Sequence, residues 1–405
     1  MLGSDSFPSG RRDTHLKRRT GEYERTALGG EQVSAFVPHP LPPLVPPIEL
    51  AGPLMDGLRA AEQALSRLEL ASEMVPSIDW VLYAFVRKEA VVSSQIEGTQ
   101  ATLVDLLRFE TGEAPPPSAG VEEVCNHLAA LRFAREQLAA PAGLPISMRL
   151  LNEAHRRLMR GERGADKQPG EVRRSQNWVG GSRPGNAVYV PPPPHRLPEL
   201  LAAFEAYLHA SDSLPPLVRT GLLHVQFETI HPYLDGNGGI GRLLIALLLE
   251  HWRLLSQPLL YLSLFFKRHR SDYYRLLGAV RTEGDWEGWL RFFLDGVATI
   301  AGEATASARE LFALVSADRR RALAIGSTST AALRLFEALP SHPILTVGSA
   351  MKLIGASKPT AGRAIDGLVE AGVLAETTGR RRDRWFAYQA YLDRLRAGTE
   401  LESLR

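Results

Sequence analysis

Apolar residues recur at spacings of three and four along most of this chain, and no other feature limits its possible folds as strongly. Leu54, Leu58, Ala61, Leu65 and Leu68 show the pattern first. Such spacing places apolar side chains on one face of a helix. Further helices are predicted at 78–92, 103–109, 121–138, 147–160, 198–209, 217–230 and 241–255, with helical structure continuing to about residue 319. The sequence therefore predicts a mainly α protein.

Length and composition narrow the class further. A chain of 405 residues with 44% apolar residues predicts two or three folded domains rather than a disordered chain. The aliphatic run 243–249 is far shorter than the roughly 20 residues of a membrane-spanning helix. No apolar segment follows the basic N-terminal residues, so no secretory signal is expected.

Charge and cysteine content bear on partners and compartment. A net charge of +2 gives the whole chain no general attraction to nucleic acid or membranes. The single cysteine, Cys125, cannot form an internal disulfide, which fits a cytoplasmic protein.

Composition shifts along the chain suggest its organisation. Residues 1–20 are polar and basic and predict a disordered arm, while 21–112 predict an N-terminal helical region. The six prolines in 37–48 predict an extended segment, either a linker or a strap packed on the core. Residues 121–315 form the expected central domain. Within it, residues 170–194 predict a β-hairpin, because Val179 and Tyr189 lie in short apolar runs around a Gly/Ser/Pro/Asn turn.

A separate C-terminal unit is expected at 328–395, with three helices followed by two short strands around a basic turn. This order is typical of a winged helix-turn-helix domain. Residues 341–395 carry eight Lys/Arg and five Asp/Glu, a net charge of +3. Candidate DNA contacts are Lys358, Thr360 and Arg363 on the third helix, with Arg381 and Arg382 at the turn. Protein contact or dimerisation is the alternative use of such a domain.

The densest cluster of chemical groups is residues 231–242, HPYLDGNGGIGR, between two helical runs. A glycine-rich loop that opens a helix presents backbone N–H groups to an anion such as phosphate. Arg242 can add a two-donor contact to a phosphate, and Asp235 can hold Mg²⁺ beside it. His231 can accept a proton from a hydroxyl near neutral pH.

Other interpretations of this cluster exist. Asn237-Gly238 is also a hairpin-turn signal, but the flanking segments have helical spacing. His224 and His231 lack a third zinc ligand at a usual spacing. The interpretation that His231 is a loop residue without any chemical role also stays open.

Residues 231–242 resemble the motif of the Fic (filamentation induced by cAMP) family, H-[PF]-[FY]-x-[DE]-G-N-G-R-x-x-R, with one departure. Residues 170–193 resemble that family's flap hairpin. Residues 88–99, KEAVVSSQIEGT, fit its inhibitory pattern [ST]-x-x-x-E-[GN]. The resemblance covers most of residues 20–315 and implies a Fic helical core with a β-hairpin flap, followed by the winged helix.

The resemblance implies a protein adenylyltransferase that moves AMP from ATP to a Ser, Thr or Tyr hydroxyl of a protein, with Mg²⁺ as cofactor. His231 would be the catalytic base and Asp235 the metal ligand. The flap residues Val179, Gly180, Gly181 and Ser182 would align the target by strand addition. The nucleotide would be bound by Gly236, Asn237, Gly238, Gly239, Ile240, Gly241 and Arg242, with Asn237 and the loop N–H groups on the phosphates. Tyr273 and Tyr274 would line the adenine pocket, or else serve ordinary helix packing.

The resemblance also implies autoinhibition. Ser93 and Glu97 are four residues apart and share one helix face. Glu97 would pair with Arg242 and withhold it from the γ-phosphate, with Ser93 assisting. Glu97-Gly98 also reads as a helix end, and both interpretations can hold together.

The departure is Gly239, which stands where the family has arginine. Loss of one cation predicts weaker phosphate binding by about tenfold to a hundredfold. Three outcomes stay open: a slower enzyme, one with another nucleotide or the reverse reaction, or a degenerate, non-catalytic member. The alternative function is a weakly active or non-catalytic Fic-like DNA-binding transcriptional regulator. The sequence also leaves a homodimer open.

Overall fold

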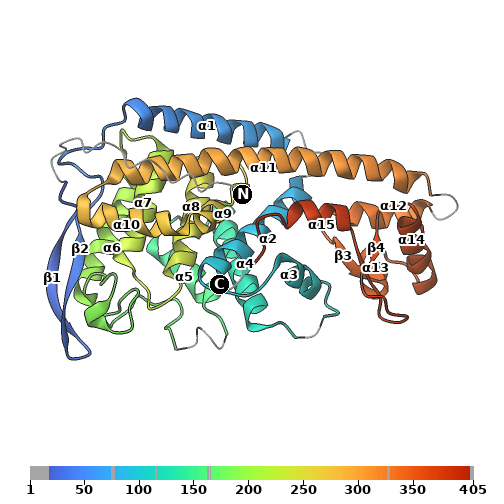
Figure 1. The fold of residues 1–405 in the computed structure, drawn as a ribbon, viewed down its shortest axis with the longest axis horizontal. Coiled ribbons are helices and arrows are strands. Elements are labelled where there is room, and N and C mark those ends of the chain that lie inside the picture. The colour runs from blue at the N-terminus through green and yellow to red at the C-terminus, as the bar shows by residue number, and fades with distance from the viewer. Residues whose placement is uncertain are drawn as a thin grey trace, which may run out of the picture.

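The computed structural model describes residues 18–401 except 74–77, 115, 162, 163, 165 and 326–328. Helices make up most of it, as predicted (Figure 1). The N-terminal part contains β1 (Gly21–Leu28), β2 (Glu31–Pro38), α1 (Gly52–Glu73), α2 (Ile78–Ile96), α3 (Leu103–Glu110) and α4 (Ala119–Ala139). The centre contains α5 (Met148–Leu158), α6 (Leu197–His209), α7 (Pro216–Ile230), α8 (Asn237–His251), α9 (Ser263–Arg268), α10 (Arg270–Glu283) and α11 (Trp286–Leu323). The C-terminal part contains α12 (Ser329–Ala338), β3 (Ile344–Thr346), α13 (Val347–Ile354), α14 (Lys358–Glu370), β4 (Ala375–Glu376), β5 (Trp385–Ala387) and α15 (Gln389–Leu395).

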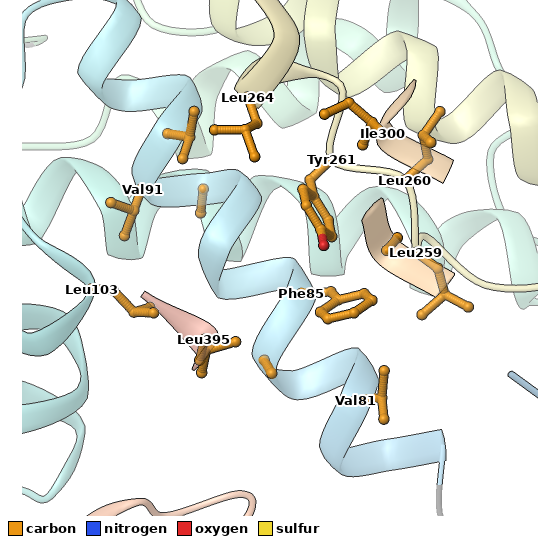
Figure 2. Close-up of a cluster of buried hydrophobic side chains, with 14 of the residues drawn as sticks. Val81, Phe85, Val91, Leu103, Leu259, Leu260, Tyr261, Leu264, Ile300 and Leu395 are labelled. Carbon is orange, nitrogen blue, oxygen red and sulfur yellow. The ribbon is translucent and has the colours of Figure 1, made fainter. Parts of the chain in front are cut away.

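The long helices α1 and α11 lie side by side along one edge of the molecule (Figure 1). The predicted apolar face of α1 is buried; Leu58 and Leu65 are 3% and 2% exposed. This face joins the larger of the two main hydrophobic clusters, which runs from α1 to the C-terminal helices. Figure 2 shows the part of that cluster around α2, where Phe85 packs beside Tyr261.

Helices α7 and α8 lie in the interior. Every residue of α7 from Leu217 to Phe227 is buried, and α8 buries Ile240, Leu244 and Leu248. A helix that is covered on all sides has little freedom to move. The six residues that join these helices, 231–236, are therefore held at both ends by rigid elements.

Three predictions need correction. Residues 21–38 are an antiparallel β-hairpin around Gly29-Gly30 rather than helix. The predicted disordered arm falls mostly on residues outside the described part, but Arg18 donates to the Pro46 carbonyl (2.7 Å) and pairs with Glu287, so its last residues are bound to the core. The second helix of the motif begins at Asn237 instead of 241.

The predicted flap hairpin has only a minimal ladder. Val179 and Tyr189 exchange two backbone hydrogen bonds of 2.8 and 3.1 Å, and a short 3₁₀ turn, Pro184–Asn186, lies between them. The hairpin β1–β2 supports the flap from the side, because the Phe36 N–H donates to the Val190 carbonyl and Arg183 pairs with Glu31.

The C-terminal unit has the predicted three helices and hairpin strands, with β3 as a third strand in the order β3-β5-β4. Helix α15 follows and packs on α11, where the Tyr388 hydroxyl donates to Asp318 (2.8 Å). The winged-helix class of this unit stays a prediction. Within the described residues, no helix is both long and apolar enough to cross a membrane.

Substitutions on α1 test this packing. Leu65→Ala should lower stability by about 2–5 kcal/mol, because it leaves a cavity against α11. Leu70→Ala on the same helix is the control, since Leu70 is 60% exposed, and it should change stability by less than about 0.5 kcal/mol. The urea midpoints of the two variants and the parent chain measure the difference. Equal midpoints for both variants would contradict the observed α1–α11 interface.

Candidate functional site

The glycine-rich segment is the first turn of a helix rather than a long loop. Gly236 has a φ of 76° and lies directly before α8. The Asn237 side chain closes the preceding loop, because its oxygen accepts from the Tyr233 N–H and its amide donates to the Tyr233 carbonyl, both at 2.9 Å. This closing role was not predicted. Direct contact of Asn237 with phosphate stays a prediction.

The N-terminus of α8 forms an anion site that is filled by the protein itself. The first backbone N–H groups of a helix have no partner within it and attract negative charge. The Glu97 carboxylate lies against Gly238 so closely that a Cβ there would collide with its Oε1 atom. Glycine permits this approach, whereas any larger residue at 238 would displace the carboxylate from its present place.

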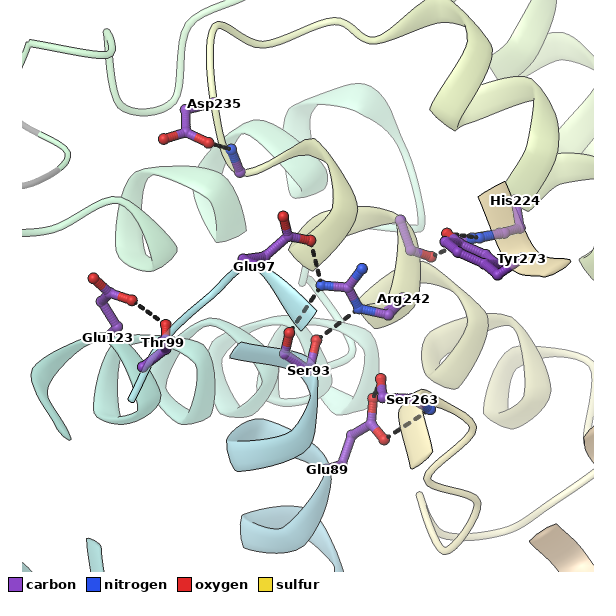
Figure 3. A network of polar contacts seen from close by, with 12 residues as sticks. Glu89, Ser93, Glu97, Thr99, Glu123, His224, Asp235, Arg242, Ser263 and Tyr273 are labelled. Carbon is purple, nitrogen blue, oxygen red and sulfur yellow. Dashed lines mark hydrogen bonds and ion pairs between the residues drawn. The ribbon is translucent and has the colours of Figure 1, made fainter. Parts of the chain in front are cut away.

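Arg242 holds the same carboxylate from the other side (Figure 3). Its Nη2 atom lies 2.7 Å from Glu97 Oε1, its Nε donates to Ser93 Oγ (2.8 Å), and Nη2 also donates to the Ser93 carbonyl (3.1 Å). The Arg242 side chain is 2% exposed, whereas that of Glu97 is 44% exposed. The predicted contact between these residues is present, and Gly98, with a φ of 95°, ends the helix beside it.

Burial and opposite charge compete at Arg242. Burial is the largest single effect and would lower the pKa of its guanidinium. The charge and hydrogen bond of Glu97, together with Tyr273 and Glu228, outweigh burial and raise that pKa above the usual value. Glu228, a half-buried residue of α7, was not predicted to belong here. Burial raises the pKa of its carboxyl to about 7, although the charge of Arg242 opposes this. In the described part of the chain, Glu228 Oε1 has no hydrogen-bond partner.

His231 lies at the end of α7 in the left-handed region, with a φ of 51°. Its Nδ1 atom is 3.3 Å from the Glu228 carbonyl, so Nδ1 carries the hydrogen and Nε2 keeps its lone pair. Burial, aided by the positive charge of Arg173, lowers the pKa of His231 to about 4. The ring is therefore neutral near pH 7 and able to accept a proton.

Two residues that sequence reasoning missed fix the loop. Buried Arg173 joins the base of the flap to the loop, because its Nε donates to the His231 carbonyl (2.9 Å) and its Nη2 to the Pro192 carbonyl (2.6 Å). His155 on α5 accepts from the Gly170 N–H (2.8 Å) and donates to the Asp235 carbonyl (3.0 Å). The position of His155 on the apolar face of α5 was the one sequence feature that could have indicated a buried structural role for this residue.

Asp235 is exposed at the edge of the site and contributes one carboxylate. One of its oxygens accepts from the Gly236 N–H (2.7 Å). Among the described residues, no group of three His, Cys, Asp or Glu side chains could bind a metal on its own. A single carboxylate beside a phosphate site nevertheless fits Mg²⁺, which takes its other oxygens from phosphate and water.

The predicted adenine residues differ from each other. Tyr273 is 1% exposed, and its hydroxyl forms a 2.9 Å hydrogen bond with Nε2 of His224. The other ring nitrogen of His224, Nδ1, contacts the Gly241 carbonyl. Tyr273 therefore packs in the core, as the alternative of ordinary helix packing expects. Tyr274 is 45% exposed. An adenine contact stays a prediction for both.

The flap and the pocket complete the geometry. Gly180 and Gly181 have positive φ angles, and Val188 opposite them is 82% exposed. A cavity of about 80 Å³ lies between α2, α5 and the start of α8, bordered by Glu97, Asp235 and Arg242. Nucleotide-sized sites are several times larger. The Glu97 side chain lies on the wall of this small cavity.

Comparison with known proteins identifies the domain. Residues 145–249 match the Fic/DOC family, and residues 55–136 match the Fic/DOC family N-terminal region. This chain therefore contains a Fic domain. Its Fic motif lies at the α7–α8 junction, within the matched residues.

Curated relatives are similar to part of this chain. This chain is 36% identical over 154 residues to the protein adenylyltransferase Fic of Drosophila grimshawi. The aligned residues are 38% of this chain and 29% of that relative. The corresponding protein of Culex quinquefasciatus is 35% identical over 152 residues. The chain thus spans under a third of these relatives' length. A Fic family protein of Desulfovibrio desulfuricans G20 shares the fold, with a TM-score of 0.55 at 22% identity over 84% of this chain and 97% of that one.

The protonation of His231 can be measured directly. Its ring should stay neutral as the pH falls from 7 to 5 and should take up a proton only as the pH passes through about 4. A titration of the ring proton shifts by NMR, with His231→Gln to assign the signal, gives the midpoint. A midpoint near 6.5, the value of a free imidazole, would show that the site does not desolvate the ring.

Proposed function

We propose that this protein is an adenylyltransferase that transfers AMP from ATP to a hydroxyl of a protein substrate and is held inactive by Glu97. The observation that carries the proposal is the buried Arg242, which faces a helix N-terminus occupied by the chain's own carboxylate. Helix N–H groups and a guanidinium together match a terminal phosphate. Relatives that share the Fic region bear the name protein adenylyltransferase Fic.

In the open state the triphosphate lies along the first turn of α8, with its γ-phosphate where the Glu97 carboxylate now lies. His231 Nε2 accepts the proton of the target hydroxyl. The hydroxyl oxygen forms a bond to the α-phosphorus, and the bond to the pyrophosphate oxygen breaks. Bound phosphates raise the pKa of the nearby imidazole, so the nucleotide makes His231 a better base. Exclusion of water and the fixed orientation of the two reactants provide the remaining rate enhancement.

Asp235 is the residue that would hold Mg²⁺ beside the phosphates. When bound, the ion neutralises charge on the nucleotide and on the leaving pyrophosphate. The Asp235 carboxylate is available to an ion without loss of other contacts, because it is exposed and bonded only to the Gly236 N–H among the described contacts.

The exposed edge of the flap suits a protein substrate. Tyr189 anchors the flap strand, because its hydroxyl donates to the Thr229 carbonyl (2.5 Å). Exposed Val188 and the glycines at 180 and 181 leave room for an extended chain to add as a strand. Arg173 fixes this strand relative to His231, so a bound hydroxyl and the base keep one geometry.

Release of the carboxylate tests the proposal. Glu97→Gly should raise incorporation of label from α-labelled ATP, into this protein or its target, by at least about tenfold, because it frees Arg242 for phosphate. His231→Ala in the same background should return incorporation to the level without enzyme. Ser93→Ala should activate more weakly than Glu97→Gly, because it removes only the hydroxyl contact to Arg242.

Ser94→Ala is the matched control, since Ser94 borders the same cavity but has no side-chain bond to Arg242 among the described contacts. Mass spectrometry of the product identifies the transferred group. If Glu97→Gly incorporates no more label than the parent protein at any ATP concentration, the inhibitory assignment is wrong.

A second candidate activity, DNA contact by the C-terminal unit, is supported by exposure. Lys358 and Arg363 are exposed on α14, and Arg381 and Arg382 are exposed on the turn between β4 and β5. Exposed cations on a helix and an adjacent turn can bind backbone phosphates.

Gel shifts with duplex DNA at 50 and 200 mM salt test this contact. Arg381→Ala/Arg382→Ala should weaken binding and reduce the salt slope by about 2. Arg319→Ala/Arg320→Ala, on α11, is the control. Absence of a shift at low salt would leave the unit a protein-contact domain.

A further inference from the structure

The space that a motif arginine would need is blocked in this protein. A Cβ atom built on Gly239 would lie 2.9 Å from Cδ2 of Leu158, the last residue of α5. Gly239 is itself buried. The missing cation therefore cannot be restored at this position without movement of Leu158, and the phosphates have to find a second positive charge elsewhere.

Another arginine borders the same cavity. Arg160, two residues after Leu158, lines the cavity of about 80 Å³ together with Gly239, Asp235 and Glu97. Among the described residues on its wall, Arg160 and Arg242 are the two arginines. His127 also lies there, but burial lowers its pKa to about 3, so it is neutral near pH 7. In so small a cavity, a long side chain on the wall stays within reach of a ligand at the first turn of α8.

The backbone of Arg160 is fixed while its side chain is exposed. The Arg160 carbonyl accepts a 2.6 Å hydrogen bond from the amide of Asn126, a buried side chain of α4. The preceding Met159 N–H donates to the His155 carbonyl (2.9 Å), which ties the segment to the helix that holds the loop. Because this backbone is already fixed, ligand binding would order only the side chain of Arg160.

We propose that Arg160 is a phosphate-binding residue that replaces the cation lost at Gly239. The guanidinium contacts the phosphates beyond the first, on the side of the nucleotide opposite Arg242. This inference rests on the proposed function, because it assigns a further residue to the same nucleotide site.

Calorimetry with Mg²⁺ and ATP, ADP or AMP tests the assignment, with every variant made in the Glu97→Gly background so that the site is open. Arg160→Ala should weaken ATP and ADP binding by about tenfold to a hundredfold and change AMP binding less than about twofold. Arg160→Lys should keep part of the affinity. Arg156→Ala is the matched control, because Arg156 is exposed on the same segment and pairs with Glu153, and it should leave all three affinities unchanged.

A rescue variant separates phosphate contact from a structural effect. Leu158→Ala/Gly239→Arg added to Arg160→Ala should restore ATP affinity, since it returns a cation to the motif position and clears the space for it. The inference is overturned if Arg160→Ala binds ATP as well as its parent, or if it weakens AMP and ATP equally. If the Glu97→Gly protein binds no nucleotide at all, the proposed function fails as well; if it binds ATP and Arg160→Ala has no effect, only the present inference fails.

Discussion

The charge of one buried guanidinium governs the site. A buried cation is costly unless an anion and hydrogen-bond acceptors surround it. Arg242 has both in the closed state, through the Glu97 carboxylate and the two oxygens of Ser93. Without that carboxylate, the same burial leaves Arg242 and the α8 N-terminus in need of another anion. The proposed inhibition and the proposed phosphate binding therefore depend on the same buried charge.

Glu97 can compete with a ligand only if α2 stays in place. The C-terminal end of α2 is held by a buried amide, because Gln95 Nε2 donates to the Ala101 and Thr399 carbonyls, both at 3.0 Å. Lys267 of α9 donates to Gln95 Oε1 (2.8 Å) and to the Glu400 carbonyl. Further along α2, Phe85 and Val91 belong to the large cluster that also contains Leu395 of α15 (Figure 2). Helix α2, which precedes Glu97, thus rests on both the central domain and the chain beyond α15.

Local patterns in the sequence were enough for the helices and for the contact of Ser93 and Glu97 with Arg242. The spacing of Ser93 and Glu97 fixes a shared helix face whatever the fold, and the position of Arg242 in a long motif supplies the partner. The start of α8 was misplaced because glycines disfavour helix, while burial of Gly239 and Ile240 outweighs that preference. The hairpin at 21–38 carried a Gly-Gly turn signal that was overlooked. Arg173 and His155 could not be assigned, because their roles depend on carbonyls at 192, 231 and 235 that only the tertiary structure brings near them.

A crystal structure of the Glu97→Gly protein with Mg²⁺ and a non-hydrolysable ATP analogue tests the central claim most directly. The account predicts the terminal phosphate against Gly238 and Arg242, in the place that the Glu97 carboxylate vacates, with the α-phosphorus facing His231. A nucleotide bound elsewhere, or a terminal phosphate that does not contact Arg242, would contradict it.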